Sequence, residues 1–316
     1  MSPLKILVLQ GGDSSEREVS LSSGRRVSAA LVARGHFVTE ADPAGDPLAI
    51  LPAAKAADVV WMALHGGTGE DGTMQAMFDL TGVRYTGSGH LASAIAMDKD
   101  LSKHLFRAAK VPTADWWMAR TDQGPDWRTP EYASRAVHAL GLPIVVKPSK
   151  QGSTVGLSIV KETAFLGVAV REAFRHDDEV MLEAFVPGRE LTVGVLGDWM
   201  MPVGEIIPTR EIYDYECKYT PGMAEELFPA PIDPAVREEA QRLTRLAYDA
   251  LKLRGCARID FRLHPNGGLF CLEANTLPGM TGTSLVPQAA QADGVSFPEL
   301  CERIALDALK STGEHG

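Results

Sequence analysis

The sequence lacks a long hydrophobic run, an excess of positive charge and any cysteine pair of the C-x-x-C type. No run approaches the ~18 apolar residues of a membrane helix, and the first residues do not resemble a signal peptide. The 31 basic and 41 acidic residues give a net charge of −10, which argues against a nucleic-acid groove or an anionic membrane as partner. We therefore expect a cytoplasmic protein without membrane or nucleic-acid partners.

Cysteine is scarce, with only Cys217, Cys256, Cys271 and Cys301 in the chain. Because no two are spaced as metal ligands or as a redox pair, zinc binding and thioredoxin-like chemistry are disfavoured. We expect buried, reduced thiols. Cys256 and Cys271 fall in two strands of a predicted hairpin, so an alternative is that these two are neighbours.

The common phosphate-binding motifs are also missing. No G-x-x-x-x-G-K-[ST] sequence occurs, so if the chain binds ATP it is not a P-loop protein. Residues 67–72 match G-x-G-x-x-G, but they follow the third predicted strand, and no acid ends the next strand. This position favours a turn whose backbone amides face a substrate over a dinucleotide site.

The first part of the chain alternates strands and helices, which predicts a parallel, doubly wound sheet. Strands are expected at 6–9, 37–41 and 59–64, and helices at 19–33, 73–80 and 91–96. Gly11-Gly12 and His65-Gly66-Gly67 follow the first and third strands. Ligands of such sheets lie at the carboxyl ends of the strands, so both segments are candidates for ligand contact.

The remainder predicts mixed α+β structure. A helix is expected at 101–109, strands at 143–148, 157–160, 180–185, 190–196 and 200–207, and helices at 233–252 and 298–309. Residues 208–228 show no period and are too long for an ordinary connection. We predict three domains: an N-terminal α/β substrate domain (1–97), a central domain (98–186) and a C-terminal domain (187–316).

The most informative stretch is residues 258–284. Two apolar runs flank Pro265-Asn266-Gly267-Gly268, a strong hairpin signal. Asp260 lies on the first strand, beside Arg258, while Glu273 and Asn275 are two apart on the second and face the same way. Such oxygen ligands suit Mg²⁺. An ordinary hairpin with polar residues facing water would show the same pattern.

Two charged residues lie at unusual places. Lys147 interrupts an apolar strand; it marks either a strand edge whose amine reaches solvent or, beside the glycine-rich loop 149–156, a phosphate site. Glu16 follows the first strand. It is either a favourable partner of a helix dipole or an anchor for a substrate ammonium group.

Aromatic residues crowd the aperiodic segment, where Tyr213, Tyr215, Lys218 and Tyr219 occur within seven positions. Such a loop can be inert and disordered. Its amphipathic residues favour a lid that closes over a site and excludes water.

Taken together, the motifs resemble those of the D-alanine–D-alanine ligases, members of the ATP-grasp superfamily. The resemblance covers nearly the whole chain and follows the family's motif order. It rests on Gly11-Gly12-x-Ser14-x-Glu16-Arg17-Glu18-Val19-Ser20, Leu64-His65-Gly66, Gly69-Glu70-Asp71-Gly72, Tyr85-Thr86-Gly87-Ser88-Gly89, Met97-Asp98-Lys99, Val146-Lys147-Pro148, Gly152-Ser153-x-Val155-Gly156, Tyr213-Asp214-Tyr215-Glu216-x-Lys218-Tyr219, Arg258-x-Asp260 and Glu273-x-Asn275-Thr276-x-Pro278-Gly279-Met280-Thr281.

The resemblance implies an ATP-grasp fold after an N-terminal doubly wound domain, with ATP between the central and C-terminal domains. It implies that ATP and two D-alanines give D-alanyl-D-alanine, ADP and phosphate through a D-alanyl phosphate, for peptidoglycan precursor synthesis. It also implies two Mg²⁺ ions, which Mn²⁺ can replace, and a homodimer. Because a carboxylate is a poor electrophile, this chemistry needs activation, positioning and charge neutralisation more than a protein nucleophile.

The resemblance also assigns roles to individual residues. The metal ligands would be Asp260, Glu273 and Asn275. The ATP site would comprise Lys99, Lys147, Ser153, Glu183, Ala184, Val186, Glu190 and Lys218, with Glu183 on the adenine amino group and Glu190 on the ribose. The catalytic set would be Glu16, Ser153, Lys218, Tyr219, Arg258 and Gly279, of which Arg258 and the Gly279 amide would form the oxyanion site. Substrate would contact Glu16, His65, Gly279, Ser284 and Leu285.

Two other hypotheses remain at this stage. A related ligase could take D-lactate or D-serine as its second substrate, although the resemblance implies D-alanine, because relatives that use D-lactate lack the tyrosine found here at Tyr219. A catalytically silent ATP-binding module would not need to keep the proposed catalytic residues together. Their joint presence therefore counts against this hypothesis.

Overall fold

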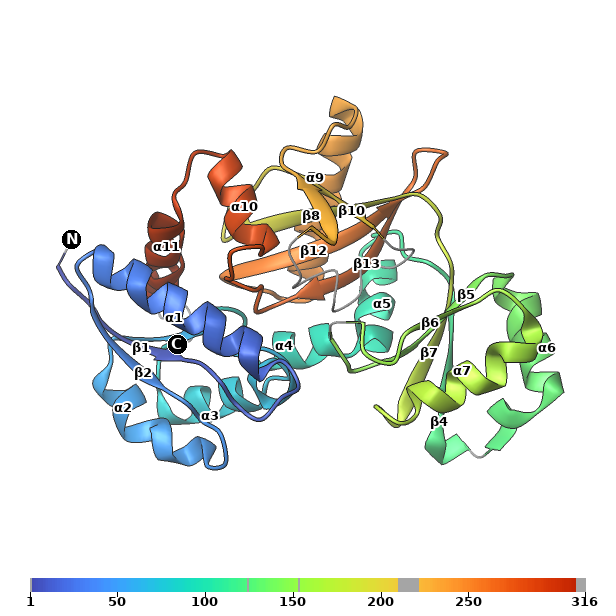
Figure 1. The fold of residues 1–316 in the computed structure, drawn as a ribbon, viewed down its shortest axis with the longest axis horizontal. Coiled ribbons are helices and arrows are strands. Elements are labelled where there is room, and N and C mark those ends of the chain that lie inside the picture. Colours follow the sequence, from blue (N-terminus) through green and yellow to red (C-terminus); the bar gives the residue numbers. More distant parts are fainter. Residues whose placement is uncertain (1, 124, 153, 210–221, 311–316) are drawn as a thin grey trace.

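A computed structural model describes residues 2–123, 125–152, 154–209 and 222–310, which form three sheets with flanking helices (Figure 1). The N-terminal sheet is parallel and has the order β2-β1-β3. Its strands are β1 (Lys5–Leu9), β2 (Phe37–Ala41) and β3 (Val59–Met62), and a single bridge adds Tyr85 beside Val60. The parallel N-terminal sheet predicted from the sequence is thereby confirmed.

Helices cover both faces of the N-terminal sheet because alternate residues of β1 point to opposite sides. Ile6 and Val8 share a core with α1 (Arg17–Ala33), whereas Leu7 and Leu9 share one with α2 (Leu51–Ala56) and α3 (Thr73–Thr81). The short helices η1 (Pro47–Ile50) and η2 (Gly67–Gly69) precede α2 and α3, and α4 (His90–Met97) leads out of this part of the chain.

The central sheet is antiparallel, with the order β4-β7-β5-β6. Its strands are β4 (Trp116–Arg120), β5 (Ile144–Pro148), β6 (Ser158–Val160) and β7 (Glu179–Ala184). Ile144 and Val146 of β5 pack into a core with α6 (Pro130–Leu140) and α7 (Leu166–Ala173). Strand alternation then turns Val145 and Lys147 to the opposite face, where they line a cleft. Helix α5 (Lys99–Ala108) precedes this sheet, and η3 (Thr121–Gln123), η4 (Pro125–Arg128) and η5 (Thr163–Phe165) lie in its connections.

The C-terminal sheet has the antiparallel order β11-β10-β8-β12-β13, and β9 pairs with β8. Its strands are β8 (Arg189–Leu196), β9 (Trp199–Met200), β10 (Gly204–Pro208), β11 (Ala224–Leu227), β12 (Cys256–Leu263) and β13 (Leu269–Asn275). Helix α9 (Pro234–Ala250) packs on this sheet. The single strand predicted at 200–207 is wrong: β9 ends at Met200, and Pro202, which has no backbone N–H to pair, lies in the break before β10.

The end of the described chain returns to the N-terminal sheet. Helix α10 (Leu285–Ala292) leads into α11 (Phe297–Lys310), which packs beside α1 and β3 (Figure 1). The indole N–H of Trp61 on β3 donates to the Cys301 carbonyl over 3.3 Å, and Arg34 pairs with Glu302. The predicted domain boundaries at 97/98 and 186/187 stay a proposal. Helix α11 belongs to the predicted C-terminal domain by sequence but packs on the predicted N-terminal domain.

Three cysteines can be placed. Cys256, Cys271 and Cys301 are all buried and unbonded, as expected of reduced thiols. Burial raises the pKa of the Cys256 thiol to about 12. The alternative that Cys256 and Cys271 are neighbours is wrong, because Phe261 pairs with Cys271 and Cys256 lies at the far end of β12. Cys217 lies outside the described residues. Among the described helices, none has both the length and the apolar character needed to span a bilayer.

Candidate active site

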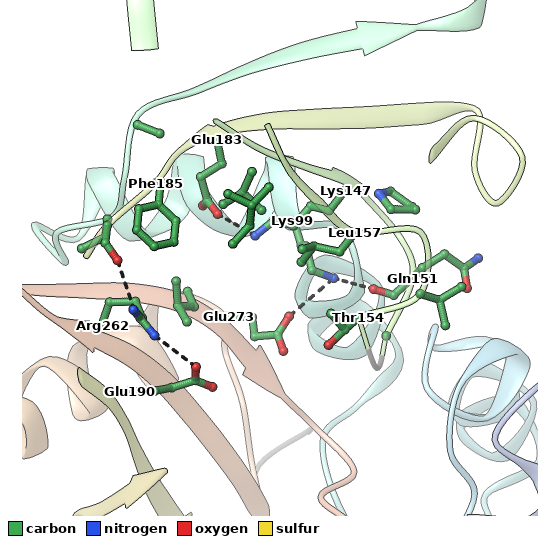
Figure 2. Close-up of a pocket in the computed structure, with 18 residues that line it drawn as sticks. Lys99, Lys147, Gln151, Thr154, Leu157, Glu183, Phe185, Glu190, Arg262 and Glu273 are labelled. Atoms are coloured by element: carbon green, nitrogen blue, oxygen red, sulfur yellow. Dashed lines mark hydrogen bonds and ion pairs between the residues drawn. The ribbon is translucent and has the colours of Figure 1, made fainter. Parts of the chain in front are cut away.

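A cleft separates the central sheet from the C-terminal sheet (Figure 2). Its walls are largely apolar, including Val145, Leu157, Ile159, Phe185 and Leu272. At one end, Figure 2 shows Phe185, Glu190 and Arg262; at the other lie Gln151 and Thr154, with Lys99 and Glu273 between them. A long cleft with apolar walls beside Phe185 and with the cations Lys99 and Lys147 along it can hold a planar base against the walls and phosphates beside the cations.

One wall of the cleft holds a buried carboxylate between two ammonium groups. Glu183 on β7 forms ion pairs with Lys147 of β5, at 2.7 Å, and with Lys103 of α5. Lys103 also donates to the hydroxyl of Thr113 over 2.6 Å. Burial alone would raise the pKa of Glu183, but the two ammonium groups outweigh it and lower the pKa to about 2. Lys147 is therefore buried and paired, and the interpretation that its amine reaches solvent at a strand edge is wrong.

Lys99 lies at the middle of the cleft. Its ammonium group donates to the Gln151 carbonyl over 2.7 Å and lies 3.5 Å from a carboxylate oxygen of Glu273. Because Lys99 is the first residue of α5, the helix fixes it close to the glycine-rich loop that follows β5. Lys99 lines both the cleft and a second pocket, so its ammonium group can contact an anionic ligand in either one.

The end of the cleft beside Phe185 is closed by Arg262 of β12. Its guanidinium donates to the Val186 carbonyl over 3.2 Å, lies 3.4 Å from Glu190 and sits 5.9 Å from the Phe185 ring centre. Ala184, Val186 and Glu190, all predicted for an ATP site, line this end together with Glu183.

The predicted hairpin forms, and it brings the three residues predicted as metal ligands to neighbouring positions on its two strands. Asp260 pairs with Glu273 across the strands, and Arg258 pairs with Asn275, with an irregularity just after Asp260. The Asp260 carboxylate accepts from Arg258 at 2.7 Å and from the Thr192 hydroxyl at 2.7 Å. Within the parts of the chain that the structure describes, no group of three or more His, Cys, Asp or Glu side chains is arranged as a metal site. A site here would need the Asn275 carboxamide to complete its ligands.

A second, more polar pocket adjoins the cleft. Its lining includes Glu16, His65 and Arg258, and also Gly279 after the hairpin. Glu16 immediately precedes α1, as expected for a residue that favours a helix start, but it does not cap the helix with its side chain and is almost fully buried. Both the pocket lining and this burial agree with the ligand interpretation.

Two titratable groups of this pocket are strongly affected by burial. Burial lowers the pKa of His65, whose ring nitrogen Nε2 lies 3.1 Å from the Ser23 hydroxyl. Burial, aided by the negative charge of Glu16, raises the pKa of Glu70 to about 8, although the Gly66 amide donates to Glu70 over 2.8 Å. Burial therefore favours the uncharged form of both side chains.

Ser284 and Leu285 lie beside this pocket rather than in its wall. Ser284 precedes α10, and its hydroxyl accepts from the Thr281 amide over 2.9 Å. A Cβ added at Gly279 would lie only 2.8 Å from that hydroxyl, so Ser284 and Gly279 are close. The Leu285 side chain is buried with Ile206 in an apolar cluster, which leaves its backbone as the group available to a substrate.

The predicted residues Ser153, Lys218 and Tyr219 lie outside the described residues, as do Tyr213 and Tyr215. The lid segment and the catalytic roles of Ser153, Lys218 and Tyr219 therefore stay predictions. The described part of the segment predicted as aperiodic includes β11, which pairs with β10.

Sequence reasoning missed Lys103, Arg262 and Glu70. Lys103 had a detectable signal: with Lys99 and Phe106 it occupies positions i, i+4 and i+7 of one helix face, where a lysine among buried positions requires a partner. Arg262 and Glu70 carry no comparable local signal, because only the fold brings them to the cleft and the second pocket.

Two sheets that close on a cleft lined by lysines and carboxylates are the architecture of the ATP-grasp class. Two family models match the chain: "D-ala D-ala ligase N-terminus" over residues 40–88 and "D-ala D-ala ligase C-terminus" over residues 105–305. The chain belongs to the D-alanine–D-alanine ligase family.

Individual relatives agree with this membership. A D-alanine–D-alanine ligase of Pelobacter propionicus is 47% identical over 305 residues, which cover 96% of both chains. One from Synechococcus sp. (strain JA-2-3B'a(2-13)) is 45% identical over 311 residues, covering 97% of this chain and 94% of the relative. Among solved structures, the Bacillus anthracis D-alanine–D-alanine ligase complexed with ATP covers 99% of this chain and is itself covered completely, with a TM-score of 0.86 and 29% identity.

Proposed function

We propose that this protein joins two D-alanine molecules at the expense of ATP, releasing ADP and phosphate, and so supplies a dipeptide for peptidoglycan precursors. The observation that carries the proposal is the junction of the two pockets. Lys99, Gly152 and Glu273 line both the cleft and the second pocket. A phosphate held beside Lys99 in the cleft is therefore next to a carboxylate bound beside Arg258, as phosphoryl transfer between them requires.

We propose that ATP binds with adenine between the sheets. The apolar walls near Phe185 suit the base, the backbone at Ala184 and Val186 can read its edge, and Glu190 can accept from the ribose hydroxyls. The Glu183 carboxylate is held in place by two lysines but keeps lone pairs for the adenine amino group. Lys99 and Lys147 would then face the phosphates, as expected from the family.

The donor chemistry of the hairpin fits magnesium. Asp260 and Glu273 are carboxylates at paired positions, and Asn275 adds a carboxamide oxygen, which are hard ligands of the kind that Mg²⁺ or Mn²⁺ takes. We propose that these three residues hold two such ions, which would neutralise phosphate charge when bound. Asp260 would then be shared with Arg258, which already orients it.

The other residues of the second pocket have roles that follow from their charge. Glu16 would bind the ammonium group of the first D-alanine, with neutral His65 beside it. The carboxylate of the first D-alanine would attack the γ-phosphorus of ATP and release ADP, leaving a D-alanyl phosphate. The free amine of the second D-alanine would attack the acyl carbon, and phosphate would leave with the C–O bond electrons.

Arg258 and the Gly279 amide are the proposed donors to the oxyanion that forms at that acyl carbon. Ser284, next to Gly279, would hold the carboxylate of the second D-alanine, with the backbone of Leu285. Ser153, Lys218 and Tyr219 would complete the site from the lid, with Lys218 on the γ-phosphate.

The family resemblance also supports a homodimer, which sedimentation or light scattering can test. A reaction that consumes ATP suits the cytoplasm, where we propose the protein acts.

The test of the function is ADP release with ATP and Mg²⁺ in the presence of D-alanine, D-lactate plus D-alanine, D-serine plus D-alanine, or L-alanine. We expect release with D-alanine alone, matched by an equal amount of D-alanyl-D-alanine, and none with L-alanine. Release that requires D-lactate or D-serine would favour the related ligases, and ATP binding without release would favour a silent module.

A further inference from the structure

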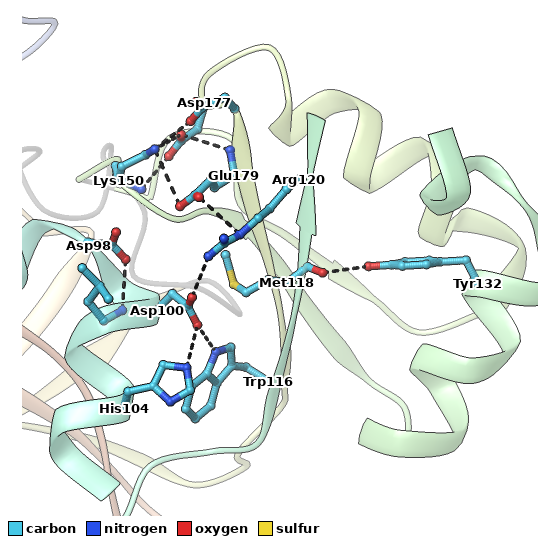
Figure 3. Close-up of polar contacts among 12 residues, drawn as sticks. Asp98, Asp100, His104, Trp116, Met118, Arg120, Tyr132, Lys150, Asp177 and Glu179 are labelled. Atoms are coloured by element: carbon cyan, nitrogen blue, oxygen red, sulfur yellow. Dashed lines mark hydrogen bonds and ion pairs between the residues drawn. The ribbon is translucent and has the colours of Figure 1, made fainter. Parts of the chain in front are cut away.

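The glycine-rich loop after β5 is fastened at its base to the turn between α7 and β7 (Figure 3). The Lys150 backbone N–H donates to the Asp177 carboxylate over 2.6 Å, and the Lys150 ammonium group lies 3.3 Å from the other oxygen of the same carboxylate. It also donates to Asp178 over 2.7 Å and lies 3.7 Å from Glu179. One residue of the loop is therefore held through both its backbone and its side chain.

The three acidic partners are not equivalent. The Asp177 side chain is only 3% exposed, whereas that of Asp178 is 70% exposed. Asp177 also accepts from the Glu179 backbone N–H over 3.2 Å. A buried carboxylate needs compensation, while an exposed ion pair contributes little, so Asp177 is the partner on which the fastening depends.

A second set of contacts ties the same turn to α5. Arg120, at the end of β4, lies 3.3 Å from Glu179 and donates to Asp100 over 3.0 Å. The other oxygen of Asp100 accepts from the Trp116 indole over 2.6 Å. Asp100 follows Lys99 in the sequence, so these contacts hold the N-terminus of α5, and Figure 3 shows Arg120 between Asp100 and Glu179.

Lys99 of α5 also contacts the loop base directly. Its backbone N–H donates to the Ser149 carbonyl over 3.3 Å, and its ammonium group donates to the Gln151 carbonyl over 2.7 Å. Lys150 stands between these two carbonyls in the sequence. A change in how Lys150 sits would therefore move both acceptors of Lys99, the cation at the centre of the cleft.

We propose that Lys150 and Asp177 form a positioning pair that fixes the loop base, so that Lys99 and the Gly152 backbone face the phosphates of ATP. Neither Lys150 nor Asp177 lines the cleft or the second pocket. The pair thus acts on nucleotide affinity through Lys99 and the loop. This inference rests on the proposed function for its ligand.

The proposal is tested with the full chain by comparing Lys150→Met, Lys150→Arg and Asp177→Ala. We expect Lys150→Met to raise the KM for ATP about fivefold, the size expected from a partly buried ion pair, with kcat and the KM for D-alanine within about twofold. Asp177→Ala should raise the KM for ATP further, because it also removes the acceptor of the Lys150 N–H. Lys150→Arg should restore most of the affinity.

Asp178→Asn is the matched control, because it removes an exposed partner of the same ammonium group and should change the KM for ATP less than twofold. An unchanged KM for ATP in Lys150→Met would overturn the proposal. So would a loss of kcat and of affinity for both substrates together without rescue by Lys150→Arg, since that indicates only a structural role. If Asp177→Ala does not fold, the Lys150 variants decide.

Calorimetric titration with ATP separates this proposal from the proposed function. A wild-type chain that binds ATP but makes no dipeptide rejects the function and still reports the affinity difference of Lys150→Met. A wild-type chain that is active, with the variant unchanged in ATP affinity, rejects the positioning pair alone.

Discussion

Replacing Glu183 by glutamine isolates the buried charge cluster on the cleft wall. The substitution keeps the shape of the side chain and removes the negative charge that compensates Lys103 and Lys147. Lys103 is fully buried, and burial already lowers its pKa. We expect Glu183→Gln to destabilise the central sheet, because removing one partner leaves buried charge uncompensated.

The magnitude follows from the pKa of Glu183, which lies at about 2 instead of its ordinary value of 4.5. That difference corresponds to about 3 kcal/mol in favour of the ionised, folded form. Breaking a buried pair costs about 3–5 kcal/mol, which agrees in size. Because the folded pKa is lowered, this contribution is complete above pH 4.5 and is lost as the pH falls through about 2.

Hydrogen exchange of the backbone amides in β5 and β7 is the assay. A loss of about 3 kcal/mol should speed the exchange of the slowest amides by about 10²-fold at pH 7. The control is Glu172→Gln, which removes an exposed carboxylate paired with Arg175 on the same part of the chain and should change exchange only slightly. Equal exchange in Glu183→Gln and wild type would refute the reasoning. So would a difference that grows, rather than shrinks, below pH 4.5.

Three further predictions concern turnover. Glu273→Ala should abolish dipeptide synthesis, because the hairpin loses a proposed metal-binding carboxylate. Near-normal rates at saturating Mg²⁺ would contradict the assignment. The control is Glu239→Ala, which removes an exposed carboxylate on α9. Arg258→Met should lower kcat about 10²–10³-fold while ATP still binds, because the variant loses a proposed oxyanion donor. Steady-state kinetics measures kcat, and calorimetry measures ATP binding. An equal loss of ATP affinity would argue against this role. Gly279→Ala should lower kcat about tenfold, since the new Cβ would lie 2.8 Å from the Ser284 hydroxyl; an unchanged rate would argue against a reacting group at this turn.

Much of the fold could be predicted because its signals are local. The Asn266–Gly267 turn between apolar runs predicted the hairpin, and strand alternation placed Glu273 and Asn275 on one face. The alternation of strands and helices before residue 97 predicted the parallel sheet. The error at 200–207 arose from reading an apolar run across Pro202, which removes a ladder hydrogen bond.

The contacts of the site were harder to predict because they join distant segments. The sequence marked Lys147 as unusual but left open whether it faced solvent; its partner Glu183 is 36 residues away. Lys150 and Asp177 form a pair only because the turn after α7 returns to the loop base. Local pattern indicates which residues need partners, and only the folded chain determines which partners they find.

The central claim is that ATP activates the carboxylate of the first D-alanine beside Arg258. The most direct measurement uses D-alanine with both carboxylate oxygens labelled with ¹⁸O, and it follows the label into the phosphate released. The account predicts one ¹⁸O atom in each phosphate, with equal amounts of ADP and dipeptide. Unlabelled phosphate released at the rate of dipeptide formation would contradict it.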